Sequence, residues 1–139
     1  MFARFHAALV LALTATGAAS PAAAQEKVAA FVIRNPTSIP IKYQVGVESP
    51  AIISGPLPVE WTDYVLPPGG VRVHAVPSHP DNGPPTVYVR FDYILTDTLI
   101  TWKMYRVETD AVANPAAGRP YAFMIRDGGA TLDLFIAPR

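Results

Sequence analysis

The stretch IPIKYQVGVE, residues 39–48, decides the fold class of this chain. Its apolar residues occupy every second position, and the positions between them carry proline, lysine, glutamine, glycine and glutamate. A period of two is the repeat of a β-strand that has one face on a core and the other in water. The stretch therefore predicts a half-buried strand of an antiparallel sheet.

Other stretches rich in β-branched and aromatic residues lie between Pro and Gly breaks, and no stretch of ten residues has the pattern of an amphipathic helix. In the stretch Leu99–Thr109, the face that carries Ile100, Trp102 and Met104 is expected to point inward. The predicted strands are Val28–Arg34, Ile39–Glu48, Val59–Leu66, Gly70–Pro77, Thr86–Ile94, Leu99–Thr109, Tyr121–Arg126 and Thr131–Ala137.

These seven or eight short strands predict an all-β fold, a single antiparallel two-sheet sandwich of the immunoglobulin-like kind. Trp61 is a candidate for its central core aromatic residue. A small closed barrel is the alternative architecture, and the sequence does not choose the strand order.

Two turns can be placed from their residue types. Pro68 and Gly69 suit the central positions of a type II turn, because the second position requires a positive φ. The run DGGA, residues 127–130, predicts a tight hairpin between the last two strands.

The first 24 residues have the layout of a secretory signal peptide. Arg4 precedes an apolar run over residues 7–15, and small residues lead to an A-x-A pattern that ends at Ala24. This layout predicts export, cleavage after Ala24, and a β-sandwich domain over residues 25–139. The apolar run is shorter than the roughly 20 residues that span a bilayer, so we expect no transmembrane segment in the mature chain, and a periplasmic or extracellular location.

The composition excludes several kinds of catalytic site and partner. The chain has no cysteine, which excludes thiol catalysis and iron–sulfur clusters. Its 11 basic and 11 acidic residues are scattered along the chain. A nucleic-acid partner needs a concentrated basic face, so none is expected, and no cofactor is expected either.

No catalytic constellation stands out in the sequence. His74, His79 and Asp81 have side chains that suit zinc or copper, and they form a weak candidate metal site. Their spacing is not that of a recognised metal motif, and His74 falls beside Arg72 on the face of its strand assigned to solvent. We therefore favour surface residues at these positions, and predict no catalytic residue and no metal.

Four aromatic residues form the candidate ligand site: Trp61, Tyr64, Tyr88 and Trp102. Sugar-binding sandwich modules stack exposed rings on the apolar faces of sugars, and Tyr64 and Tyr88 are expected on faces opposite the core. A second set of residues falls on faces assigned to solvent and would form cross-strand ion pairs if its strands are neighbours. This set is Arg72, His74, Arg90, Asp92 and Asp133.

The runs NPTSIPIKYQV (residues 35–45) and LPPGGVRVH (residues 66–74), with Trp61 between them, resemble short exported bacterial β-sandwich proteins with no assigned activity. Those proteins also open with a strand that ends in N-x-T, followed by Y-x-V, a tryptophan and a PG turn. The resemblance covers about half of the mature chain. It implies a fold and no catalytic residue.

We therefore predict a non-enzymatic exported β-sandwich that acts as a binding or structural module of the cell envelope, with an envelope protein or a glycan as its partner. One alternative is a carbohydrate-binding module. Another is a small metal-dependent enzyme that uses His74, His79 and Asp81. An exposed edge strand can also recruit another chain by β-augmentation, although the sequence does not locate that edge.

Overall fold

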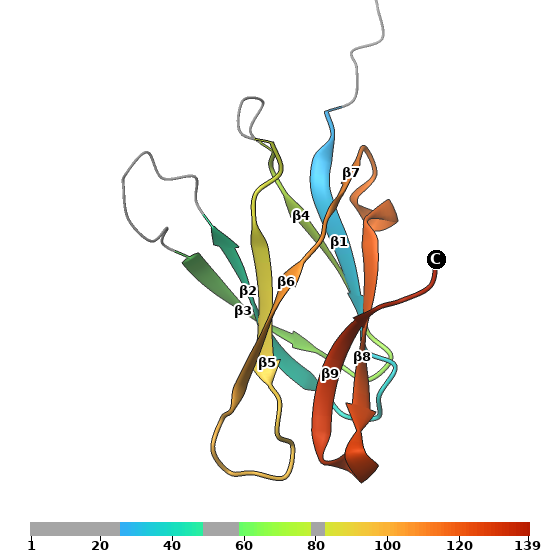
Figure 1. Ribbon diagram of the computed structural model, residues 1–139. Coiled ribbons are helices and arrows are strands. Elements are labelled where there is room, and N and C mark those ends of the chain that lie inside the picture. The colour runs from blue at the N-terminus through green and yellow to red at the C-terminus, as the bar shows by residue number, and fades with distance from the viewer. Residues whose placement is uncertain (1–25, 49–58, 79–82) are drawn as a thin grey trace, which may run out of the picture.

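The computed structural model describes residues 26–48, 59–78 and 83–139. The predicted signal peptide, residues 1–24, lies outside this part of the chain. The described residues form nine strands, two single-turn 3₁₀ segments and no α-helix. The strands lie in two layers (Figure 1). The elements are β1 (Val28–Arg34), β2 (Ile41–Glu48), β3 (Val59–Leu66), β4 (Val71–Val76), β5 (Val87–Asp92), β6 (Trp102–Val107), β7 (Asp110–Val112), η1 (Pro115–Ala117), β8 (Arg119–Arg126), η2 (Asp127–Gly129) and β9 (Thr131–Ile136).

The strands form two open sheets, so the two-sheet sandwich is confirmed and the closed barrel is wrong. One sheet has the order β4-β1-β8-β9, with β7 paired to β1, and the other has the order β3-β2-β5-β6. Every strand pair is antiparallel except β1 with β8. The sheets meet at one corner, where the Leu132 amide donates to the Tyr93 carbonyl at 2.9 Å. No ladder joins β3 to β4 or β6 to β9 in the described chain, so the barrel does not close.

The core lies between the sheets, and β2 contributes to it the apolar side chains that its alternating pattern predicts. Ile41, Tyr43 and Val45 are buried, while the side chains between them face outward. Phe91 of β5 and Phe123 of β8 meet across the core edge to face, with ring centroids 5.2 Å apart. Burial of these apolar faces is the main stabilising term of such a fold.

Strand β6 has the opposite orientation to the predicted one. Ile100, Trp102 and Met104 are exposed, whereas the Tyr105 ring stacks on Phe91 with a centroid distance of 5.8 Å. The inward face of β6 also carries Lys103, whose ammonium group reaches a carboxylate on β9. A polar inner face is possible here because β6 is an edge strand, where long side chains reach past the core.

All eight predicted strands are present, with small shifts at their ends, and β7 is an additional strand. Its three residues lie between the predicted strands Leu99–Thr109 and Tyr121–Arg126, and they pair with β1. Both predicted turns are confirmed. Gly69 has a φ of 71° and the Gly70 amide donates to the Pro67 carbonyl at 2.9 Å, while η2 closes the β8–β9 hairpin.

A buried asparagine ties two of the turns together. The Asn35 amide group donates to the carbonyls of Leu66 and Pro67, at 3.0 and 3.1 Å, and to that of Ile39 at 2.8 Å. Its side-chain oxygen accepts from the Thr37 amide at 3.0 Å. The β1–β2 turn is thereby fixed to the β3–β4 turn, and both of these turns lead from one sheet to the other.

Candidate binding site on the four-stranded sheet

The outer face of the β3-β2-β5-β6 sheet gathers three of the four predicted ligand residues. Because Tyr43 and Val45 point inward, Gly46 points outward, and its cross-strand neighbours are Trp61 of β3 and Tyr88 of β5. Trp102 lies on the same face at the far edge, on β6. The strand register therefore places the three rings on one surface.

Arg90 lies between the two tryptophans. The central carbon of its guanidinium group is 4.0 Å from the Trp61 ring centroid and 4.9 Å from the Trp102 ring centroid. Arg90 Nε donates to Gln44 Oε1 at 2.5 Å, and Gln44 Nε2 donates to Asp63 Oδ1 at 2.6 Å. Cation–π attraction and this chain of hydrogen bonds hold the guanidinium group in place. We call Trp61, Arg90 and Trp102 the aromatic–arginine stack.

Gly46 makes room for the stack. A Cβ atom at this position would lie 2.8 Å from the Trp61 ring and 2.5 Å from Val59 Cγ1. The indole of Trp61 therefore lies directly over the glycine, half-buried on the outside of the sheet. This also shows that Trp61 is not the central core aromatic that the sequence suggested.

A groove of about 580 Å³ lies beside the stack. Its walls combine apolar side chains with groups that donate and accept hydrogen bonds. Asp92 on its border accepts a hydrogen bond from the Thr101 amide at 3.0 Å, which fixes the β5–β6 connection beside the groove. The residues that line it are Lys42, Tyr43, Gln44, Asp63, Tyr64, Val65, Asp92, Ile100 and Trp102.

Large apolar side chains remain exposed around this groove. Ile100 is 62% exposed, Met104 58% and Trp102 46%, and Val65 and Leu99 are also exposed. The solvent face of an antiparallel sheet ordinarily carries polar side chains. A contiguous apolar patch on such a face is typical of a surface that contacts another molecule.

Tyr64, the fourth predicted ligand residue, also lines the groove, but its ring lies on the other side of β3 from the aromatic–arginine stack. Its ring stacks on the buried Tyr43, with centroids 5.4 Å apart, and meets the His74 ring edge to face at 4.8 Å. Tyr64 therefore lies on the inner side of β3, at the open edge of the sandwich. The prediction that it faces away from the core is wrong.

His74 is also internal, which corrects its assignment to the solvent face. It is only 7% exposed, and its ring stacks on Phe31 at 4.7 Å. Burial, aided by the charge of Arg72, lowers the pKa of His74 to about 4. The other two candidate metal ligands, His79 and Asp81, lie outside the described residues. Within the described ranges, no three His, Asp or Glu side chains gather as a metal site.

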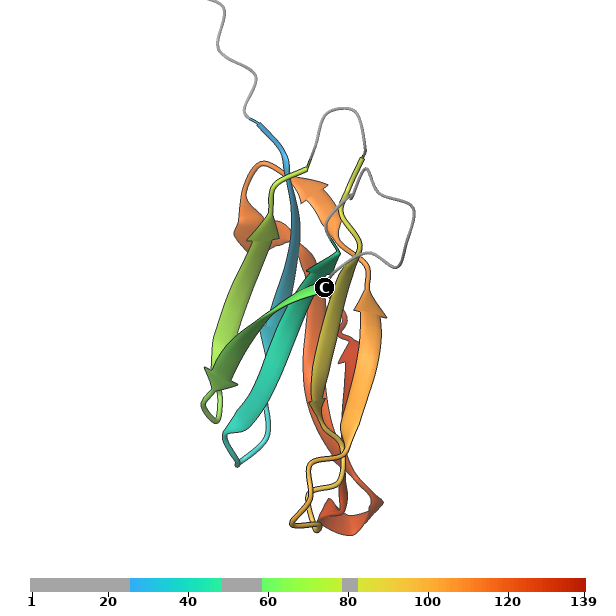
Figure 2. The ribbon, with the colours of Figure 1, turned by 90° about the vertical axis from the view of Figure 1, so that its left-hand side faces the viewer.

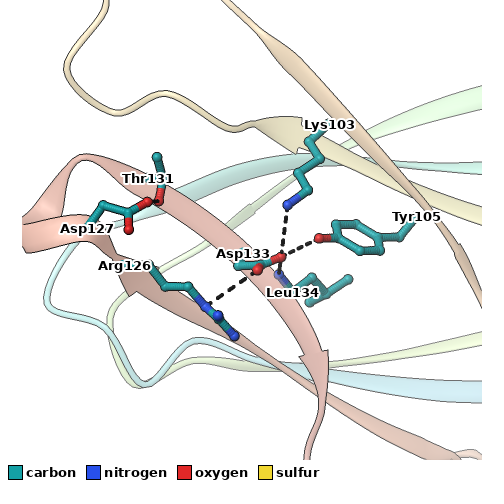
Figure 3. A network of polar contacts seen from close by, with 7 residues as sticks. All are labelled: Lys103, Tyr105, Arg126, Asp127, Thr131, Asp133 and Leu134. Atoms are coloured by element: carbon teal, nitrogen blue, oxygen red, sulfur yellow. Dashed lines mark hydrogen bonds and ion pairs between the residues drawn. The ribbon is translucent and has the colours of Figure 1, made fainter.

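The predicted polar set is dispersed rather than joined. Arg90 and Asp92 belong to the outer face described above, while Asp133 of β9 forms a separate network (Figure 3). Asp133 accepts hydrogen bonds from Tyr105 and from Lys103 of β6, the latter at 3.3 Å, and Arg126 lies 3.5 Å away. This network joins the edges of the two sheets.

The pKa values of one hydroxyl group and one carboxyl group in this network are shifted. Burial raises the pKa of Tyr105 above its ordinary value. Burial also acts to raise the pKa of Asp133, but the hydrogen bonds from Tyr105, the Leu134 amide and Lys103 outweigh it, so the net shift is downward. Asp133 is thus a charged acceptor whose donors are already present, which suits a structural link between sheets.

Sequence reasoning found the three aromatic residues but missed Arg90 and Gln44 as members of the site. Their roles depend on the registers of β5 with β2 and of β5 with β6. The glycine inside the alternating stretch was the available signal, because a glycine in a strand often marks the close approach of another group.

Comparisons with known proteins add no functional information. No family model matches the chain, and no curated protein and no solved structure matches it. None of the helical segments in the described residues is long or apolar enough to cross a membrane. The resemblance to short exported bacterial β-sandwich proteins stays a prediction.

Proposed function

We propose that this protein is a non-enzymatic binding module of the cell envelope, exported by its first 24 residues, that binds a protein partner through the outer face of the β3-β2-β5-β6 sheet. The observation that supports this most strongly is the exposure of Ile100, Trp102 and Met104 beside the aromatic–arginine stack. The face of β6 that the sequence assigned to the protein core is thus free to contact another molecule.

The residue types on this face favour a protein as the partner. Trp, Met and Arg are enriched in protein interfaces and include the residues that contribute most to binding. Arg90 is held by its neighbours before any contact, so little conformational entropy is lost when a partner binds. The groove would accept an apolar side chain that projects from the partner, since Val65 and Ile100 line it.

The charges on this face restrict the partner further. Lys42 on one side of the groove is balanced by Asp63 and Asp92. A surface of mixed sign does not favour a strongly acidic or basic partner. The partner surface should therefore be largely apolar and close to neutral at its centre.

Site-specific photo-crosslinking in envelope extracts of the source cell tests the proposal. A photoreactive residue at Met104 should give one discrete adduct of protein size, and Ile100→Glu in the same chain should abolish that adduct. Met124→Glu is the matched control, because Met124 is exposed on β8 of the other sheet, and the adduct should persist. The proposal fails if no adduct forms, or if both variants affect it equally.

A glycan is the second candidate ligand, and the groove itself favours it. Trp102 lies there with Asp63 and Asp92, and an aromatic ring next to carboxylates is a common arrangement in sugar sites. Titration with soluble envelope polysaccharides should then change the tryptophan fluorescence, and Trp102→Ala should remove the change. A flat titration across the panel would leave only the protein partner.

A further inference from the structure

Strand β4 has one edge that no described strand pairs with. It is the first strand in the order β4-β1-β8-β9. The Asn35 amide donates to the Gly70 carbonyl at 2.9 Å, so hydrogen-bonded pairs recur at every second residue along the β1–β4 ladder from there. The main-chain amides and carbonyls of Val71, Val73 and Ala75 must then point away from β1, toward the free edge.

The edge strands β3 and β6 carry two charged residues each, whereas the edge strands β4 and β9 carry one each. Charged side chains are a common protection of sheet edges. Strand β3 has Glu60 and Asp63, and β6 has Lys103 and Arg106. The one permanently charged residue of β4 is Arg72, and its guanidinium group lies over the Tyr64 ring, 5.1 Å from the centroid.

The free edge of β4 is apolar and open. Val71 is 58% exposed and Val73 is 42% exposed. Strands β3 and β4 diverge from the turn that joins them (Figure 2), and a cleft of about 410 Å³ lies along β4, lined also by Val45 and Tyr64. The neighbouring sheet therefore leaves space beside β4 for another strand.

We propose that a second copy of this chain pairs antiparallel with β4 along this edge, with the two-fold axis at Val73. In this register Val73 faces Val73 of the second copy, Val71 faces Ala75, and Arg72 faces His74. An edge strand of one copy is thereby paired with the same strand of the other. The two copies are related by a two-fold axis, as in most protein dimers.

The sequence of β4 is complementary to itself in this arrangement. Val71, Val73 and Ala75 share the outer face of the sheet, so the pairing would place apolar residues opposite apolar residues. Arg72 would face an imidazole that is neutral at pH 7, because burial keeps His74 unprotonated. No like charges oppose each other, and the free amides and carbonyls of both copies find partners.

A second copy is favoured over a foreign strand because the complementarity comes from β4 alone. The proposal is independent of the proposed function, since β4 belongs to the sheet opposite the aromatic–arginine stack. Loss of the dimer would leave the binding face intact, and absence of a partner would leave the dimer intact.

Sedimentation velocity of the mature chain, over concentrations from about 1 to 500 µM at pH 7.5, tests the proposal. We expect a monomer–dimer equilibrium, and Val73→Lys should weaken it at least tenfold. Val71→Lys, two residues along the same edge, should have the same effect, which guards against a folding defect in one variant. Ile136→Lys is the matched control, because Ile136 is 54% exposed on β9 at the opposite edge of this sheet.

Circular dichroism of each variant establishes that the fold is retained. A wild-type chain that stays monomeric at every concentration overturns the proposal. A dimer that survives both β4 substitutions, or that Ile136→Lys disrupts equally, also overturns it, since either result places the interface elsewhere.

Discussion

The phenol oxygen of Tyr43 lies 2.8 Å from Nε2 of His74, so a hydrogen bond joins β2 of one sheet to β4 of the other inside the sandwich. Burial keeps both groups neutral. It lowers the pKa of His74 to about 4, with a further contribution from the charge of Arg72, and it raises the pKa of the Tyr43 phenol. The contact is therefore a neutral link across the core.

We expect this link to make stability depend on pH. In the unfolded chain His74 takes up a proton as the pH falls below its ordinary pKa of 6.5, whereas the folded chain resists protonation until the pH nears 4. Folding stability from this group is complete above pH 6.5 and is lost as the pH falls toward 4. Urea unfolding should show a loss of about 2 kcal/mol between pH 7.5 and 5 from this residue.

His74→Gln is the matched variant, because an amide can still hydrogen-bond to the Tyr43 hydroxyl but does not titrate. We expect the variant to be less stable at pH 7.5 and to show a much smaller loss of stability down to pH 5. Equal pH slopes in the two proteins would mean that another group is responsible.

The strand pattern could be predicted wherever one face of a strand is uniformly apolar. Strand β2 meets that condition, and its alternation matches its burial. Strand β6 does not, because Lys103 and Tyr105 on its inner face are satisfied by Asp133, some thirty residues farther along the chain. A contact of that range leaves no trace in the local pattern, so the more apolar face was wrongly assigned to the core.

The misplacement of His74 has the same cause. In VRVHAV three of the four apolar residues, Val71, Val73 and Ala75, share one face, yet that face is the outer one. Arg72 and His74 point inward at the sheet edge. The aromatic residues of the candidate site were predictable from their type. Their assembly around Arg90 was not, because it depends on the strand order and register that the sequence left open.

Asn35 is expected to be essential for stability. Replacing it with Ala would remove one donor from each of three carbonyl groups, of which Pro67 keeps the Gly70 amide and Ile39 keeps the Thr37 hydroxyl, and would leave the Thr37 amide without its acceptor. Because an unsatisfied buried polar group costs about 1–3 kcal/mol, we expect Asn35→Ala to lower the free energy of unfolding by roughly 3 kcal/mol.

Asn114→Ala is the control for this prediction. Asn114 is exposed and accepts one hydrogen bond, from the Ala116 amide at the start of η1, so its loss should cost about 1 kcal/mol or less. Comparable losses in the two variants, measured by urea unfolding, would contradict the structural role of Asn35.

The contribution of the Asp133 network to stability can be tested by comparing the same substitution at Asp133 and at the nearby Asp127. Asp133→Asn would direct amide hydrogens at groups that are themselves donors, among them Lys103 and Tyr105. We expect a loss of roughly 1–2 kcal/mol in urea unfolding. Asp127→Asn removes the charge of a carboxylate that, among the described contacts, accepts one hydrogen bond, from the Thr131 hydroxyl at an exposed site. This substitution should cost a few tenths of a kcal/mol. Equal costs would show that Asp133 does not join the sheets.

The N-terminal segment makes a prediction about the mature protein. If residues 1–24 direct export, the protein recovered from the periplasm or medium should begin at Gln25. N-terminal sequencing or intact mass measurement checks this. Ala24→Arg, which disrupts the A-x-A pattern, should leave a longer, uncleaved chain. Wild-type protein that keeps Met1 and stays in the cytoplasm would contradict the assignment.

Gly46 and Trp61 should be energetically coupled. Gly46→Ala would place a methyl group within 2.8 Å of the indole and 2.5 Å of Val59 Cγ1, so both side chains must shift. We expect a cost of about 1–3 kcal/mol from this overpacking, together with a change in tryptophan fluorescence. In a Trp61→Ala background the methyl group has more room, and the cost of Gly46→Ala should fall by about 1 kcal/mol. A double-mutant cycle by urea unfolding measures the coupling. If the two costs simply add, the indole does not rest on the glycine, and the aromatic–arginine stack is not held by the surface beneath it.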